Sequence, residues 1–302
     1  MKKRKNGEII PLSRNFMFIQ VFYYHNGVER LERFISDYLG LPYEKVHNHI
    51  TLLPRDAEKD KRLTADMQLD LVLDLDDNKI NIELNNSPYT GLRERNLTYA
   101  ELLGGHQYKK IKGRSSKEIY KDIKATLQIN LNYFGNNDRL ITRFKLVSEE
   151  TSEIFSENLR IDNVDMTKIN DKNYKCKSEI EEKVYLWCKL INTNNIYIFK
   201  EICAKLLPRD EAERVVELVE YLSSDEEMYL LGDEEDQEEL IKAAKLDYAI
   251  KEASKKAIEQ GIEQNKKESA IEFHKNGVSD ELIINSLHIT KEKLDEYLNN
   301  EY

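Results

Sequence analysis

Two acidic residues and one amide in a short predicted hairpin could together bind a divalent metal ion. The hairpin covers residues 70–85, with Asp70 at its start and Glu83 and Asn85 at its end. With a four-residue turn at 76–79, Asp70 lies opposite Asn85, and Glu83 is one diagonal step away, roughly 7–8 Å between alpha carbons. We therefore expect the two carboxylates to converge on one spot of the polar face.

Converging carboxylates on a rigid sheet provide the oxygen ligands that Mg²⁺ prefers, and the ion commonly completes its shell with water and substrate phosphate. The corresponding reaction is metal-assisted hydrolysis of a phosphodiester, in which the ion acidifies a water molecule and offsets charge on the phosphate. Asp74 is a candidate ligand of a second ion or a residue that supports the ligands of the first, because aspartate is otherwise disfavoured in strands. A second interpretation stays open here, since acidic residues on the wet face of a hairpin are often only solvated.

The elements that would position these residues follow from the spacing of apolar side chains. Leucine and isoleucine occupy every second position of both arms of the hairpin, the period of strands with one buried and one accessible face. In the predicted register Leu75 pairs with Ile80, and Leu71 pairs with Leu84. Further strands are expected at 126–133, 141–147 and 159–164, and helices at 27–39 and 92–110.

The helix expected at 92–110 follows a turn-like segment that contains Pro88 and Gly91. Arg95 and Tyr99 lie four residues apart on one face of this helix, so both could look back over the carboxylates. An ordinary surface helix is the other interpretation.

A basic segment at 109–124 favours contact with a polyanion. Clustered lysine and arginine residues bind phosphates and release counterions, which gives affinity independent of sequence. For any single lysine of the cluster, a solvated surface position is the other explanation. The predicted DNA contacts are Arg95, Lys109, Lys110, Lys112, Arg114 and Lys117.

The acidic hairpin is one of several segments that share a pattern with a known family. The segments are Lys61-Arg62-Leu63, Asp70-Leu71-Val72-Leu73, Asn81-Ile82-Glu83-Leu84-Asn85 and Arg95-Asn96-Leu97-Thr98-Tyr99, with 15–22 and 31–39 upstream and 127–134 downstream. Together they resemble the Rpn family of recombination-promoting nucleases, which belongs to the PD-(D/E)XK nuclease superfamily. The resemblance implies an α/β fold with a mixed sheet flanked by helices, and an all-helical C-terminal region is expected after it.

By this resemblance, Asp70 corresponds to the metal-binding aspartate of the superfamily and Glu83 to the acidic residue of its second motif. Asn85 stands where the superfamily has lysine and where Rpn members often have glutamine. An amide can hold a water or a phosphate, but it carries no positive charge. The nearest basic residues that could replace the lysine are Lys61, Arg93 and Arg95.

The resemblance implies a deoxyribonuclease that depends on Mg²⁺, or on Mn²⁺, and cuts double-stranded DNA internally during recombination or transposition. In that reaction Asp70 and Glu83 hold the ion, and Asn85 and Arg95 help to place the scissile phosphate. Another hypothesis is a catalytically impaired member that binds DNA as a recombination accessory protein, with Asn85 as the defect. A protein with only protein partners is the third hypothesis.

The net charge of −10 is concentrated in one region of the 302-residue chain. Residues 201–240 contain fifteen acidic and three basic residues, so the remainder carries a small positive excess and a nucleic-acid partner is not excluded. A hydrophobic content of 40% excludes a disordered protein. No apolar run has the roughly 20 residues that span a membrane, and no signal-peptide pattern follows the basic start, so we expect a cytoplasmic protein. Three cysteines without paired spacing indicate neither a disulfide framework nor a zinc site.

Three regions are expected along the chain: a nuclease-like domain at 1–175, a helical region with a long charged helix at 176–262, and a small helix-turn-helix-like tail at 263–302. Apolar residues at helical spacing indicate the helices of the last two regions. The tail is similar in outline to DNA-reading modules, but its last helix lacks the arginine, glutamine and asparagine of a base-reading face. We expect these C-terminal helices to serve packing or homo-oligomerisation instead.

Overall fold

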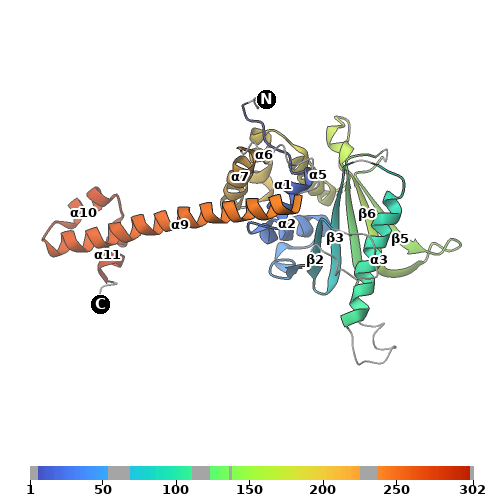
Figure 1. Ribbon diagram of the computed structural model, residues 1–302, viewed down its shortest axis with the longest axis horizontal. Coiled ribbons are helices and arrows are strands. Elements are labelled where there is room, and N and C mark those ends of the chain that lie inside the picture. The colour runs from blue at the N-terminus through green and yellow to red at the C-terminus, as the bar shows by residue number, and fades with distance from the viewer. Residues whose placement is uncertain are drawn as a thin grey trace. The chain divides into compact units, whose positions relative to one another are not determined.

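The computed structural model describes residues 6–53, 69–86, 88–110, 123–135, 138–224 and 237–299. Its described strands form one mixed sheet in the order β1-β2-β3-β4-β6-β5 (Figure 1). Strands β3, β4 and β6 run parallel to one another, and the outer pairs are antiparallel. The strands are β1 (Ile50–Leu52), β2 (Leu71–Leu75), β3 (Asn78–Asn85), β4 (Thr126–Asn132), β5 (Ile141–Val147) and β6 (Ile154–Asp165). The predicted mixed sheet with flanking helices is confirmed.

The chain divides into two compact units, Met1–Ile241 and Lys242–Tyr302. The first contains the sheet and the helices up to α7, and the second is helical, as expected for the C-terminal region. The predicted boundaries at 175 and 262 stay predictions. The α-helices are α1 (Asn15–Phe22), α2 (Gly27–Leu39), α3 (Leu92–Lys110), α5 (Glu179–Asn192), α6 (Ile196–Leu206), α7 (Arg209–Ser224), α9 (Gln237–Lys275), α10 (Asp280–Leu287) and α11 (Lys291–Asn299). None of the helices in the described ranges is long and apolar enough to cross a bilayer.

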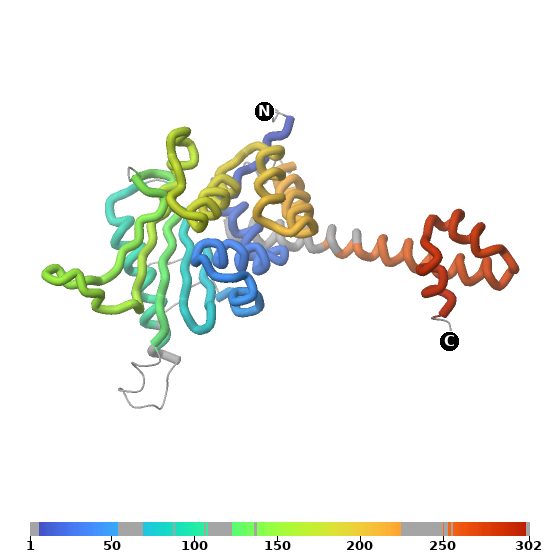
Figure 2. The backbone as a smooth tube through the Cα atoms, turned by 180° about the vertical axis from the view of Figure 1, so that it is seen from behind, coloured from blue at the N-terminus to red at the C-terminus, as the bar shows by residue number. Residues whose placement is uncertain are grey.

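Helices α1, α2 and α5–α7 pack together, and their backbones lie side by side in Figure 2. Aromatic side chains form part of the contact between them. The ring of Trp187 lies 6.1 Å from that of Phe22 and 5.6 Å from that of Phe34. Tyr38 of α2 donates a hydrogen bond of 2.8 Å to Asp162, which lies on β6 beside the buried Ile129 of β4. These helices therefore cover the apolar face of the sheet.

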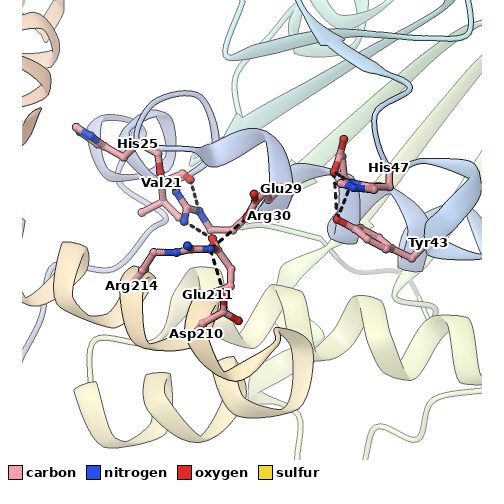
Figure 3. A network of polar contacts seen from close by, with 10 residues as sticks. Val21, His25, Glu29, Arg30, Tyr43, His47, Asp210, Glu211 and Arg214 are labelled. Atoms are coloured by element: carbon pink, nitrogen blue, oxygen red, sulfur yellow. Dashed lines mark hydrogen bonds and ion pairs between the residues drawn. The ribbon is translucent and has the colours of Figure 1, made fainter. Parts of the chain in front are cut away.

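A buried ion pair joins α2 to α7 within this helical layer (Figure 3). The side chains of Arg30 and Glu211 are each 3% exposed and are directly paired. Arg30 also donates to the carbonyls of Val21 and His25, and Glu211 also accepts from Arg214. Each charged group of this Arg30–Glu211 cluster therefore has a charged or carbonyl partner.

The β2–β3 hairpin has a shorter turn than the sequence predicts. Asp76 and Asp77 both adopt the left-handed conformation, with φ of 49° and 70°, which is the pattern of a two-residue type I′ turn. The Asp74 carboxylate accepts the Asp77 N–H at 2.7 Å and thereby supports this turn. Leu73 consequently pairs with Ile80, and the predicted pairing of Leu75 with Ile80 is wrong by two positions. An even shift keeps the buried and polar faces as predicted.

Helix α3 lies over the polar face of the sheet, in front of the strands in Figure 1. Its residues Tyr99 and Leu103 pack with Val72 of β2, which lies on that face. As a result, β3 from Lys79 onwards and all of β4 are buried. The expectation of a water-accessible polar face is therefore wrong, because the following helix covers it.

Candidate active site

The two predicted acids lie directly side by side under α3. Extending the observed β2–β3 register by one residue places Asp70 opposite Glu83. The sequence predicted Asn85 in that position. The Asp70 N–H donates to Oε1 of Glu83 at 3.1 Å, and the Leu84 N–H donates to Oδ2 of Asp70 at 2.8 Å. Asp70 is 9% exposed and Glu83 is fully buried. Adjacent strands thus fix two carboxylates in one buried place.

The electrostatics of this pair resist the charged form of Glu83. Burial, followed by the neighbouring Asp70 charge, raises the pKa of Glu83 to about 8. Hydrogen bonds from the Asp70 N–H and from Asn81, and the charge of Arg95, act in the opposite direction. Since these groups do not restore the usual pKa, a bound cation would stabilise the site.

Arg95 projects from the first turns of α3 onto Glu83. Its Nη2 lies 2.7 Å from Oε2 of Glu83, and its Nη1 donates to the Tyr89 hydroxyl at 2.8 Å. The guanidinium carbon lies 5.0 Å from the centre of the Tyr99 ring. Burial opposes the charge of Arg95, but the Tyr89 hydrogen bond and the Glu83 charge raise its pKa above the usual value. The side chain is 34% exposed, so the charged guanidinium contacts the buried Glu83 and is also accessible to solvent.

Several buried polar atoms around these residues have no partner in the part of the chain that is described. Asn85 donates to Oδ1 of Asn132 at 2.9 Å, but its own carbonyl oxygen accepts no bond there. Buried atoms without a partner commonly mark the place of a water or an ion. Four of the seven such side-chain atoms in the described ranges belong to β3 or α3: Oδ1 of Asn81, Asn85 and Asn96, and Nε of Arg95.

This donor set fits a hard divalent cation. Within the described ranges, no three histidine, cysteine, aspartate or glutamate side chains are grouped so that they could hold a metal ion by themselves. Mg²⁺, however, is usually held by one or two carboxylates and retains water or substrate phosphate in its other positions. Asp70 and Glu83 supply the carboxylates, and Asn85 supplies a further oxygen with no other partner among the described residues.

Comparison with known families agrees with this geometry. The sequence model described as PD-(D/E)XK nuclease family transposase matches residues 13–249. The chain belongs to this family. The predicted superfamily is thereby confirmed, and nucleases of this kind generally use divalent metal ions. Comparison with curated proteins and with solved structures gives no match.

Within the nuclease domain, the other predicted residues lie apart from the acidic pair or outside the described ranges. Asp74 pairs with Lys79 and supports the hairpin turn. The backbone of Lys109 and Lys110 forms the end of α3. The predicted residues that fall outside the described ranges are Lys61, Lys112, Arg114 and Lys117.

A row of amide side chains beside Glu83 is not among the residues predicted from the sequence. Asn81 lies on β3, Gln128 and Asn130 lie on β4, and Asn163 lies on β6. In the sequence, they alternate with apolar residues and so resemble a solvated strand face. One signal was available, since the polar positions of 126–132 carry amides and a threonine but no charge. Charged residues are the ones that usually occupy a solvated face.

Proposed function

We propose that the protein is a Mg²⁺-dependent DNA endonuclease, with Mn²⁺ as an alternative ion. The observation that carries this proposal is the buried pair of Asp70 and Glu83 on adjacent strands, in which the Asp70 N–H donates to Oε1 of Glu83. Asp70 and Glu83 would hold the ion. When bound, such an ion makes a water more acidic and offsets charge on the phosphate oxygens.

Arg95 is the proposed source of the positive charge that Asn85 lacks. Its guanidinium contacts Glu83 and is one-third exposed, so it can reach a phosphate next to the acids. Guanidinium groups bind phosphate with two parallel hydrogen bonds. Asn85 supports the same step with an amide that can orient a water or a phosphate oxygen.

Double-stranded DNA is the proposed substrate, in a reaction linked to recombination or transposition. The family description supports a nuclease or transposase role. The basic residues at and beyond the end of α3 (Lys109, Lys110, Lys112, Arg114 and Lys117) are proposed to add contacts to the backbone phosphates. A cytoplasmic location and association through the C-terminal helices complete the proposal.

Plasmid cleavage tests this function. The full chain should nick supercoiled DNA with Mg²⁺ or Mn²⁺, and EDTA should abolish the reaction. Asp70→Asn and Glu83→Gln should lower the rate about a thousandfold, equivalent to about 4 kcal/mol of lost transition-state stabilisation, and should keep DNA binding. Glu94→Gln is the matched control, because this acid is exposed in the first turn of α3.

The second candidate function is an impaired member that binds DNA without cutting it. The observation that favours it is Asn85, an uncharged residue that by the resemblance stands where the superfamily has lysine. A wild-type protein that binds DNA but never cuts with either ion would establish this role. Absence of any salt-sensitive DNA association would exclude both functions.

A further inference from the structure

The row of buried amides leads from Glu83 across three strands of the sheet. Asn81 pairs in register with Gln128, and Asn130 pairs with Asn163. Asn81, Gln128 and Asn130 are each at most 1% exposed. All four side chains lie on the sheet face that carries Glu83.

From Asn81 onwards the hydrogen bonds between the amides run away from Glu83, and Asn81 also donates to Glu83 itself. Asn81 Nδ2 donates to Glu83 Oε1 at 3.1 Å and to Gln128 Oε1 at 2.9 Å. Gln128 Nε2 then donates to Asn130 Oδ1 at 2.9 Å, and Asn130 Nδ2 donates to Asn163 Oδ1 at 2.9 Å. Oε1 of Glu83 accepts from Asn81 Nδ2, and this contact turns the Asn81 amide nitrogen towards Glu83 and thereby orients the following amides.

Stability alone does not account for this row. Buried polar networks cost free energy unless every group is satisfied, and apolar side chains of similar volume are often neutral or better. The carbonyl oxygen of Asn81 has no partner among the described residues, so the row is not fully satisfied. It therefore has the cost of a buried network without its full compensation.

The contacts of Glu83 show what the row can do. Oε1 is held from two sides, by the Asp70 N–H at 3.1 Å and by Asn81 at 3.1 Å, while Oε2 faces Arg95 at 2.7 Å. Removing Asn81 would leave Oε1 with the Asp70 N–H as its one donor among these contacts, so the carboxylate would be held less firmly against rotation about its last side-chain bond. Gln128 holds Asn81 in turn.

We propose that Asn81 is a positioning residue, held by Gln128, that fixes the Glu83 carboxylate for the metal ion. This inference rests on the proposed function for the ion, but the placement of Glu83 can be tested separately. Groups that orient a metal ligand typically contribute 10- to 100-fold to metal affinity.

The first test is Mn²⁺ binding to the full chain without DNA, measured by calorimetry. Asn81→Leu, which removes both donated bonds, should weaken binding about tenfold or more. Gln128→Met should weaken it about threefold, and Asn163→Leu, at the far end of the row, should leave it within about twofold. The matched control is Ile82→Val, on the opposite face of β3, which should lower thermal stability without changing Mn²⁺ affinity.

A loss of affinity that follows thermal stability, instead of distance from Glu83, would overturn the proposal. The second test is a crystal structure of metal-free Asn81→Leu beside that of the wild type. The Glu83 carboxylate should leave the Asp70 N–H in the variant, and an unmoved carboxylate would also overturn the proposal. If the wild type binds no Mn²⁺ while Glu83 moves in Asn81→Leu, the metal function fails and the positioning of Glu83 by the row is retained.

Discussion

The protein contains two buried charged clusters that differ in how well they are neutralised. In the Arg30–Glu211 cluster, each charge faces an opposite charge or a carbonyl. In the Asp70–Glu83 pair, two acids share one place and the pKa of Glu83 remains raised. The first arrangement is that of a structural contact between helices. The second is unfavourable for the protein alone and becomes favourable when a cation binds, which is the property expected of a functional site.

Breaking the Arg30–Glu211 cluster should have the largest effect on stability. Glu211→Leu leaves Arg30 buried without its carboxylate, and removing one partner of a buried ion pair typically costs about 3–5 kcal/mol. Urea denaturation should show this loss. Glu213→Leu on the same helix removes an exposed pair with Arg209 and should change stability by less than about 0.5 kcal/mol. Equal effects of both variants would show that the Arg30–Glu211 cluster is not a structural contact.

The Asp70–Glu83 pair should make the stability of the fold depend on pH in the absence of metal. Folded Glu83 keeps its proton up to a pH of about 8, whereas in the unfolded chain its pKa is near 4.5. The folded state therefore binds more protons between these values, and stability falls as pH rises, by at most about 1.4 kcal/mol per pH unit. Thermal melting in EDTA should show a midpoint that decreases by several degrees from pH 5 to pH 8. A midpoint that rises over this range would contradict the raised pKa.

Much of the hairpin could be predicted from sequence, but its register could not. The alternation of leucine and isoleucine fixed the faces of β2 and β3, and Pro88 and Gly91 marked the start of α3. The register depends on the backbone of Asp76 and Asp77 adopting positive φ. The same residues also fit a four-residue polar turn, so composition does not distinguish the two turns. The convergence of Asp70 and Glu83 survived this error because the shift was even.

The burial of the site has one sign in the local sequence, the absence of charge at the polar positions of 126–132. Gln128 and Asn130 otherwise alternate with apolar residues as solvated residues would, and the position of α3 shows what covers this face. Strand period identifies the two faces of a sheet but not what packs on each of them. The chemistry of the site was therefore easier to predict than its surroundings.

Neutralising Glu83 should change stability less than breaking the Arg30–Glu211 cluster does, and the change should have the opposite sign. Glu83→Gln removes the repulsion from Asp70 while keeping an oxygen that can accept from Asn81. At pH 8 without metal, we expect this variant to be about 1 kcal/mol more stable than the wild type by urea denaturation. It should also melt with little dependence on pH, and Mn²⁺ should no longer raise its midpoint. A loss of several kcal/mol would instead make the pair structural, like Arg30 and Glu211.

The smallest change in stability is expected for Arg95→Lys, which keeps the charge and alters only its geometry. A lysine can reach Glu83 or Tyr89, but it lacks the planar fork that contacts both residues. Because the position is one-third exposed, stability should change by less than about 0.5 kcal/mol. Cleavage, in contrast, should fall about tenfold, the equivalent of about 1.4 kcal/mol, if the guanidinium binds the scissile phosphate through two hydrogen bonds. Unchanged cleavage would assign Arg95 to neutralising Glu83 alone, and the phosphate contact would then have to come from another basic residue such as Arg93.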